Sequence, residues 1–328
     1  MRPFAYTRPR AIEEASQITA EDTAMAIAGG TNLLDLMKLQ VETPRRLADI
    51  NRLGFDEIKD TPDGGLSLGA LATNTATAVH PRVRSDYPVL ARAILSGATQ
   101  QLRNKATNGG NLCQRTRCFY FTNIGQPCNK REPGSGCGAI DGIAKLHAVL
   151  GTSDQCIATY PGDMAVALSA LDAKVHIIAA DGGERTVPIH DFHCLPGDTP
   201  WRENVLEDGE IITAITLPPP VAGTQIYRKV RERSSYAFAL VSIAAVVEIK
   251  DGLFSRADLA FGGLAHKPWH DPRISEALIG EPPTAPTFDR AADILLESAR
   301  GYGENDFKIP LARRTLHAVL QQAAEGAA

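Results

Sequence analysis

The stretch that decides the fold is "AIAGGTNLLDLMK", residues 26–38. It begins with a short apolar run, passes through Gly29 and Gly30, and continues with apolar residues at helical spacing. A strand that leads through a tight glycine turn into a helix is typical of an α/β arrangement. The turn leaves backbone N–H groups unblocked at the positive end of the helix dipole, where they can hold a phosphate. Taken alone, the same turn can also be a plain connection between strand and helix.

A second glycine pair lies in "RNKATNGGNLCQ", residues 103–114. Adjacent glycines let the backbone approach a flat ligand closely, and the neighbouring Thr107, Asn108 and Asn111 can satisfy its polar atoms. An ordinary loop is the alternative for this stretch. The two glycine stretches together favour a bound ligand.

Composition limits the classes of function. The chain has 328 residues, is 44% hydrophobic and carries a net charge of -4, so no overall basic field favours nucleic acid or an anionic membrane. The N-terminus has no uninterrupted apolar segment of the kind that a secretory signal requires. We therefore expect a protein that stays in the cytoplasm or is exported with a partner that carries the signal. The longest nearly uncharged stretch, residues 236–249, is too short to cross a bilayer.

The chain divides into three predicted parts. Residues 1–55 read as an N-terminal α/β subdomain, and residues 56–220 as a second, larger α/β part with a cysteine-rich insertion at 113–156. Within this part, "GGLSLGALATNTATAVHP" (64–81) alternates as a strand does. A proline run at 218–220 marks a boundary, and residues 224–328 read as an α+β domain with a hairpin turn at Asp251-Gly252 and two helical stretches after it.

Five of the six cysteines fall within the insertion, and four of them are candidate ligands: Cys118, Cys128, Cys137 and Cys156. Glycine and proline in "GQPC" and "PGSGCG" provide tight turns beside two of them. The spacing differs from the compact ferredoxin motif, so from spacing alone both metal ligands and buried free thiols remain open. Two further alternatives are a zinc-stapled, non-redox binding protein, although CxxC knuckles are absent, and a disulfide-bonded secreted domain.

The two glycine stretches, taken together with three later segments of the chain, resemble a known family. The segments are "PGDMAVALSALDAKV", "LEDGEIITAITLP" and "YRKVRERSSYAFALVS", and in this order they resemble the FAD-binding middle subunit of the molybdenum hydroxylases, the xanthine dehydrogenase and aldehyde oxidoreductase family. The insertion is similar to that of the flavin subunit of bacterial periplasmic aldehyde oxidoreductases, which carries an additional [4Fe–4S] cluster. The resemblance implies a two-part FAD-binding domain of the vanillyl-alcohol-oxidase/CO-dehydrogenase flavoprotein type, followed by an α+β domain.

The resemblance also implies site residues. The FAD contacts would be Ala28, Gly29, Gly30, Thr31, Asn32, Leu33, Gly97, Ala98, Thr107, Gly110, Asn111, Asp163, Leu206 and Lys229. Pattern alone gives Asp163, Leu206 and Lys229 other roles: a helix cap, a core residue and a solvated strand residue. The cluster ligands would be Cys118, Cys128, Cys137 and Cys156, while Cys113 would be a small buried side chain. The basic residues among them, Arg115, Arg117, Lys130 and Arg131, would offset the negative cluster or form a solvated face.

No catalytic residue is expected on this chain, because the resemblance implies an electron-transfer role. Electrons would pass from a large subunit with a molybdenum cofactor, through the [2Fe–2S] clusters of a small subunit, to the FAD of this chain and then to an external acceptor. The three subunits would form a heterotrimer, exported to the periplasm on a partner's signal or else retained in the cytoplasm. The family usually has an acidic residue where this chain has "SSYAFA", so the flavin surroundings are expected to differ.

Overall fold

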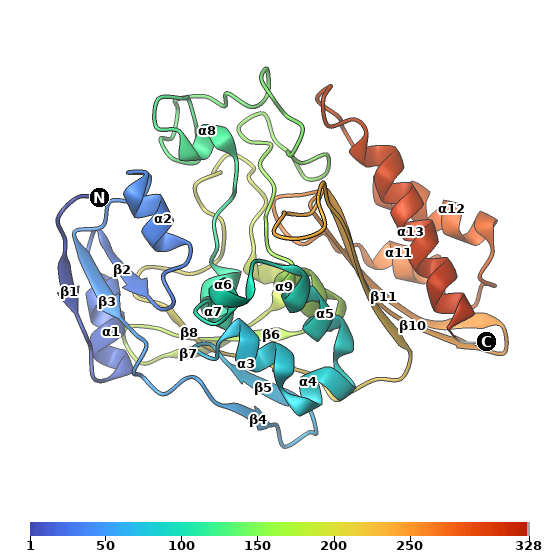
Figure 1. Cartoon of the computed structure of the whole chain (residues 1–328), viewed down its shortest axis with the longest axis horizontal. Coiled ribbons are helices and arrows are strands. Elements are labelled where there is room, and N and C mark those ends of the chain that lie inside the picture. The colour runs from blue at the N-terminus through green and yellow to red at the C-terminus, as the bar shows by residue number, and fades with distance from the viewer. Residues whose placement is uncertain (327–328) are drawn as a thin grey trace.

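A computed structural model describes residues 1–326 and contains three sheets in succession along the chain. Figure 1 shows the N-terminal sheet at the left, the middle sheet at the bottom, and the C-terminal sheet with its helices at the right. Loops fill the upper part of the molecule between the first and third of these layers. This mixed α/β and α+β architecture confirms the predicted fold class.

The N-terminal sheet is parallel, with strand order β1-β3-β2. Its elements are β1 (Ala5–Thr7), α1 (Ile12–Thr19), β2 (Ala24–Ile27), α2 (Leu33–Lys38) and β3 (Arg46–Asp49). Ala15 and Ile18 of α1 are buried, in keeping with the spacing of apolar residues on one helix face. The predicted glycine turn therefore lies between the end of β2 and the start of α2.

The middle sheet has the order β4-β5-β8-β6-β7, and every neighbouring pair in it is antiparallel. Its strands are β4 (Ile58–Asp60), β5 (Leu66–Gly69), β6 (Lys174–Ile178), β7 (Glu184–Pro188) and β8 (Ile211–Leu217). The accompanying helices are α3 (Asn74–Val79), α4 (Pro81–Asp86), α5 (Pro88–Ser96), α6 (Gln100–Arg103), α7 (Asn108–Leu112), α9 (Met164–Ala170) and α10 (Ile189–Phe192).

One segment of the middle part differs from its sequence pattern. The alternation in residues 64–81 continues past β5, yet residues 74–79 form helix α3. Thr73 caps this helix, since its side-chain oxygen accepts a hydrogen bond from the Ala76 N–H at 3.1 Å. A local cap therefore outweighs the preference of the threonines for extended structure.

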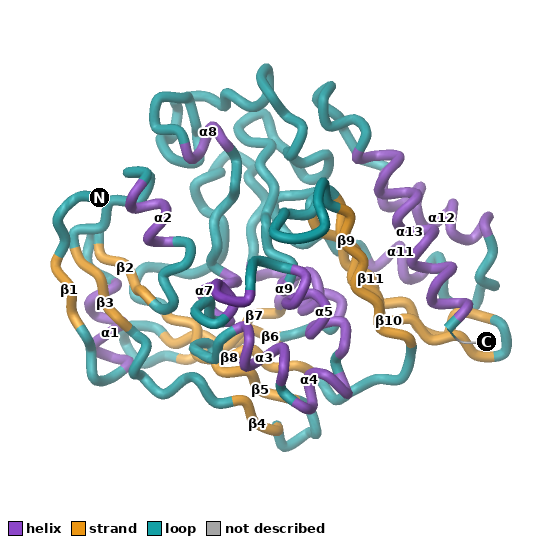
Figure 2. Tube along the Cα trace, in the orientation of Figure 1, coloured by secondary structure: helices purple, strands orange, loops and turns teal. Residues whose placement is uncertain are grey.

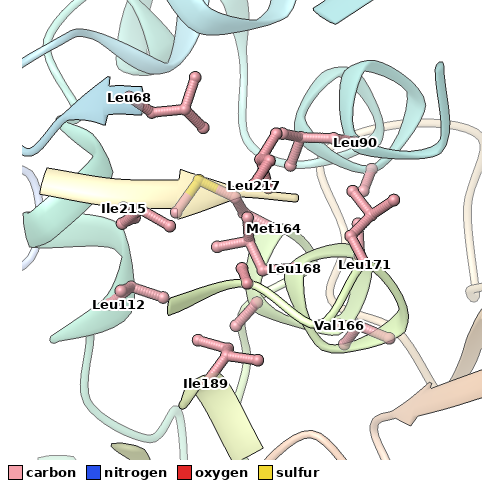
Figure 3. Close-up of a cluster of buried hydrophobic side chains, with 14 of the residues drawn as sticks. Leu68, Leu90, Leu112, Met164, Val166, Leu168, Leu171, Ile189, Ile215 and Leu217 are labelled. Atoms are coloured by element: carbon pink, nitrogen blue, oxygen red, sulfur yellow. The ribbon is translucent and has the colours of Figure 1, made fainter. Parts of the chain in front are cut away.

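The core of the middle part joins the sheet to the helices that carry the candidate site. Figure 3 shows Leu68 and Leu217 from the sheet, Leu112 at the end of α7 and Met164 at the start of α9 in one buried cluster. Because such side chains pack at close to crystalline density, they fix both helices against the sheet. The glycine pair before Leu112 and the aspartate before Met164 are thereby held in place.

The C-terminal sheet is antiparallel, with the order β11-β10-β9. Its strands are β9 (Thr224–Val230), β10 (Val241–Lys250) and β11 (Leu253–Gly262), and its helices are α11 (Pro272–Glu276), α12 (Ala285–Leu296) and α13 (Lys308–Glu325). Asp251 and Gly252 both have positive φ, +52° and +76°, as the predicted two-residue hairpin turn requires. The described residues contain three helices after this hairpin, where the sequence pattern predicted two. None of the helices in residues 1–326 is long and apolar enough to cross a membrane.

The cysteine-rich insertion is almost entirely loop (Figure 2). Its one regular element is the short helix α8 (Phe119–Thr122). The Arg131 guanidinium donates to the backbone oxygens of Tyr120 and Phe121, at 2.8 Å each, and so ties α8 to the second half of the loop. An isolated β-bridge pairs Cys128 with Cys137. Side-chain hydrogen bonds and one bridge thus give the insertion a defined shape without a sheet.

Candidate cofactor sites

A cavity of about 650 Å³ opens beside the glycine turn, and we call it the glycine cavity. Eight of the predicted FAD contacts line it together with Glu42, Cys113 and Arg115: Ala28, Gly29, Gly30, Thr31, Asn32, Leu33, Thr107 and Gly110. They come from the turn between β2 and α2 and from the start of α7. The structure thus brings the two glycine stretches together around a single space.

Asn32 has an unused donor in this cavity. Its side-chain oxygen accepts a hydrogen bond from the Arg115 backbone N–H at 2.9 Å. Its Nδ2 is buried and has no hydrogen-bond partner among residues 1–326. An unpaired buried donor costs about 1–3 kcal/mol, so a polar ligand in the cavity would relieve this cost.

The second glycine stretch is shaped by its own polar residues. Thr107 caps α7, since its side-chain oxygen accepts from the Gly110 N–H at 3.2 Å. Asn108 is fully buried, and its Nδ2 donates to Gly69 O at 3.1 Å and to Thr77 Oγ1 at 2.9 Å. Asn108 therefore holds the frame of the site, while Gly110 faces the cavity.

Asp163 lies at the start of α9, but its side chain makes no capping hydrogen bond. Its carboxylate instead accepts from Lys229 Nζ at 2.7 Å and from Tyr227 Oη at 2.6 Å. The Lys229 side chain is only 4% exposed, so the alternatives of a capping aspartate and a solvated lysine are both wrong. Burial raises the pKa of Asp163, and the opposing charge of Lys229 favours the ionised form.

The four remaining predicted flavin contacts are not among the residues that line the glycine cavity. Gly97 follows α5, and a Cβ added to it would stand 3.0 Å from Asp163 Oδ2. Ala98 has a positive φ of +51°, which is uncommon for a residue other than glycine. Asn111 donates from Nδ2 to Asn74 Oδ1 at 2.9 Å. Leu206 is partly buried and packs against the core of the middle part. This position agrees with the alternative that Leu206 is a core residue.

The four candidate cysteine ligands line one further cavity of about 280 Å³, which we call the cysteine cavity. Cys118, Cys128, Cys137 and Cys156 all contribute to its wall, and no aspartate or glutamate does. Cys113 instead lines the glycine cavity. Burial raises the pKa of Cys118 to about 12 and that of Cys156 to about 11. Cys118 and Cys156, the first and last of the four candidate ligands in the sequence, therefore line the same space, and no carboxylate lines it.

Lys130 brings a buried positive charge to the cysteine cavity. Its Nζ lies 2.8 Å from Glu203 Oε1 and donates to Pro200 O and to His266 Nε2, at 2.6 Å each. The charge of Lys130 lowers the pKa of Cys156 against the larger, raising effect of burial. The alternative of a solvated basic face is therefore wrong for Lys130.

Glu203 links the two cavities. Besides Lys130, it accepts a hydrogen bond from Arg115 Nε at 2.6 Å, and Arg115 also pairs with Glu42 in the wall of the glycine cavity. Burial alone would raise the pKa of Glu203, but Arg115 and Lys130 hold it at about 2. A continuous series of ion pairs thus connects the wall of the glycine cavity to that of the cysteine cavity: Glu42, Arg115, Glu203 and Lys130.

A third space of about 570 Å³, the middle cavity, is bordered by both Cys118 and Asp163. His147 and Thr116 line it as well, and both also line the cysteine cavity. Arg117 lies on its wall and stacks over the Phe238 ring, with 5.2 Å between the guanidinium carbon and the ring centre. Cys118 is the one candidate ligand that faces both the cysteine cavity and the middle cavity.

Three residues of these sites escaped the sequence analysis: Tyr227, Glu203 and His147. Tyr227 and Glu203 pair with residues 64 and 88 positions away, and His147 contacts a sulfur 29 positions away. The only sequence signal for any of them is the position of Tyr227 two residues before Lys229 on an expected strand, which places both side chains on one face.

Comparison with known proteins agrees with this arrangement. Residues 2–220 match the family described as the FAD binding domain in molybdopterin dehydrogenase, and residues 225–323 match the CO dehydrogenase flavoprotein C-terminal domain. The chain is 52% identical to the aldehyde oxidoreductase FAD-binding subunit PaoB of Escherichia coli strain K12, over 98% of this chain and 99% of that protein.

Solved structures share the fold over the whole chain. Quinoline 2-oxidoreductase from Pseudomonas putida 86 superposes with a TM-score of 0.75 at 26% identity, covering 99% of this chain and 98% of that one. Carbon monoxide dehydrogenase from Hydrogenophaga pseudoflava gives a TM-score of 0.77 at 23% identity, with coverage of 99% and 98%. The predicted resemblance is confirmed at the level of the family, and the chain belongs to the FAD-binding subunits of the molybdenum hydroxylases.

Proposed function

We propose that this chain is the FAD- and [4Fe–4S]-carrying electron-transfer subunit of a molybdenum-dependent aldehyde oxidoreductase. The observation that carries the proposal is the meeting of four distant cysteines in one cavity, joined by Cys118 to the space that reaches Asp163. The identity of 52% with a subunit named for aldehyde oxidation supports the substrate class. Membership of a flavin-binding family rules out the alternative of a non-redox zinc protein.

The glycine cavity fits the phosphates of FAD. It offers the unpaired Nδ2 of Asn32 and the backbone of Gly110, where an added Cβ would lie 2.9 Å from Thr107 Oγ1. In this proposal the residues of the glycine cavity bind the cofactor, and the Asp163–Lys229 pair orients it. The bound flavin supplies the ability to accept and release electrons. The chain's own residues exclude water and fix the position of the ring.

The cysteine cavity fits a cluster better than a single ion. Among residues 1–326, no three His, Cys, Asp or Glu side chains stand close enough to share one metal ion. Zinc requires four donors at about 2.0–2.3 Å from one centre. The wall of the cysteine cavity holds four cysteines and no carboxylate, and four cysteine thiolates are the ligands that a [4Fe–4S] cluster takes. All six cysteines are free thiols, which argues against the disulfide-bonded alternative.

The proposal includes two partners and an exported complex. A small subunit with [2Fe–2S] clusters would deliver electrons from a large subunit that holds the molybdenum cofactor and oxidises the aldehyde. Relatives of this chain are named as an FAD-binding subunit and as a medium chain, which supports a complex of several chains such as a heterotrimer. We place the complex in the periplasm, exported on a partner's signal, with the cytoplasm as the alternative.

The test is to purify the chain with and without its two partners and measure FAD, iron and acid-labile sulfide. We expect one FAD per copy of this chain, four irons beyond those of the partner's [2Fe–2S] clusters, and aldehyde-dependent bleaching of the flavin absorbance. The chain without partners should not oxidise aldehydes. Aldehyde oxidation by the isolated chain, or a complex whose middle chain holds no flavin, would contradict the proposal.

A further inference from the structure

The His147 side chain lies within hydrogen-bonding distance of a cysteine sulfur. Its Nε2 lies 3.1 Å from Cys118 Sγ, and the imidazole is buried, with 3% of the residue exposed. Within residues 1–326, no other side chain is hydrogen-bonded to the sulfur of a candidate ligand. The ring borders the cysteine cavity and the middle cavity at once, as Cys118 does.

The C-terminal domain holds this ring in place. The backbone oxygen of His147 accepts hydrogen bonds from Lys308 Nζ at 2.9 Å and from Asn305 Nδ2 at 3.3 Å. Both donors are fully buried, and Lys308 also donates to Gly263 O at 2.8 Å, at the end of β11. The position of the imidazole is therefore fixed by a part of the chain that does not belong to the insertion.

The ligation of Cys118 would require Nε2 to be the donor. Nδ1 is buried and has no hydrogen-bond partner in the described part of the chain. A ligating cysteine is a thiolate, which only accepts hydrogen bonds, so the proton must lie on Nε2 for the two groups to attract each other. A hydrogen bond to a ligand sulfur stabilises the more negative, reduced form of a cluster.

We propose that His147 is a positioning residue. It donates a hydrogen bond from Nε2 to the Cys118 thiolate, the ligand that faces the middle cavity, and so helps to set the reduction potential of the cluster. This inference rests on the proposed cluster. It would give the insertion a redox role, because hydrogen bonds to the ligand sulfurs help to set the reduction potential of a cluster. The two ligands on the Cys128–Cys137 bridge have no such donor in residues 1–326.

The test is a redox titration of the intact complex, followed by EPR of the reduced cluster. In His147→Phe the ring remains but the donor is lost, so the cluster potential should become more negative while iron content stays at the wild-type level. His147→Gln restores an N–H donor and should return the potential toward wild type. The control is Tyr120→Phe, which removes a polar atom from the same cavity wall. The Tyr120 hydroxyl accepts from the Ile143 N–H at 2.7 Å and bonds to no sulfur, so this variant should leave the potential unchanged.

The outcomes separate the inference from the function on which it rests. A wild-type complex that contains FAD, but no iron beyond that of the partner's [2Fe–2S] clusters, would overturn the cluster and the role of His147 with it. An iron-loaded His147→Phe complex with the wild-type potential would overturn only the role of His147. If both His147 variants lose iron, the residue is structural and the inference is wrong. If only His147→Phe loses iron and His147→Gln keeps it, the hydrogen bond retains the cluster rather than setting its potential, and the inference is wrong.

Discussion

Lys130 and Glu203 form a buried ion pair in which Nζ lies 2.8 Å from Oε1 and the lysine side chain is 1% exposed. Glu203 also pairs with Arg115, so one carboxylate holds two cations. One cation lines the cysteine cavity and the other the glycine cavity. The same carboxylate therefore holds one cation in the wall of each cavity.

Glu203→Gln should lower the free energy of unfolding by about 3–5 kcal/mol, because Lys130 then keeps a buried charge without a carboxylate partner. The matched control is Glu207→Gln. Glu207 is 64% exposed in its ion pair with Arg202, so its loss should cost no more than about 0.5 kcal/mol. Urea unfolding of both variants gives the comparison. Equal free energies of unfolding for the two variants would show that the ion pairs of Glu203 contribute nothing to stability.

The same carboxylate predicts a pH dependence. The pKa of Glu203 is about 2 in the folded chain, against 4.5 for an unperturbed glutamate. A lowered pKa means that the folded state binds the proton less readily than the unfolded state does. The stabilisation by Glu203 is therefore complete above about pH 4.5 and is lost as the pH falls toward 2. The difference in stability between wild type and Glu203→Gln should narrow across this range, and a constant difference would contradict the assignment.

Gly110→Val should reduce the FAD content of the purified protein, since the branched side chain would project into the glycine cavity. Gly110 is a better test position than Gly30. Gly30 has a φ of +71°, so a valine there is strained whether or not a phosphate binds. Gly125→Val is the control, because the nearest atom to its added Cβ is Asn123 Oδ1 at 3.4 Å. A Gly110→Val protein with stoichiometric FAD after gel filtration would refute the loop assignment.

Asp163 and Lys229 should be coupled in a double-mutant cycle. Either single variant, Asp163→Asn or Lys229→Met, leaves a buried charge unpaired and should destabilise the chain by about 3–5 kcal/mol. The double variant should cost less than the sum of the two, because both charges are then absent. Additive losses in urea unfolding would mean that the 2.7 Å contact carries no energy. FAD content measured on the same proteins reports whether the pair also orients the cofactor.

Much of the fold could be predicted from local sequence patterns. The glycine pairs, the Asp251-Gly252 turn and the apolar spacing of α1 each act within a few residues, so their positions could be predicted. Helix α3 was missed because one capping hydrogen bond at Thr73 decides between helix and strand. Family resemblance, rather than spacing, supplied the FAD-binding assignment that the family match then confirmed.

The interior of the site could not be predicted in the same way. Glu203 reaches Arg115 across 88 residues, and Lys308 reaches the backbone of His147 across 161. Such contacts depend on how distant parts of the chain pack against one another, and a local sequence pattern does not contain this information. The cysteines are an intermediate case, because their types and clustering were visible while their meeting in one cavity depends on the folded loop.

Iron and acid-labile sulfide in single Cys→Ser variants of the complex test the central claim most directly. Cys118→Ser, Cys128→Ser, Cys137→Ser and Cys156→Ser should each lose the [4Fe–4S] EPR signal and most of the associated iron. Cys113→Ser and Cys194→Ser should retain both, because neither residue lines the cysteine cavity. Loss of the cluster in Cys113→Ser together with full retention in Cys156→Ser would contradict the account.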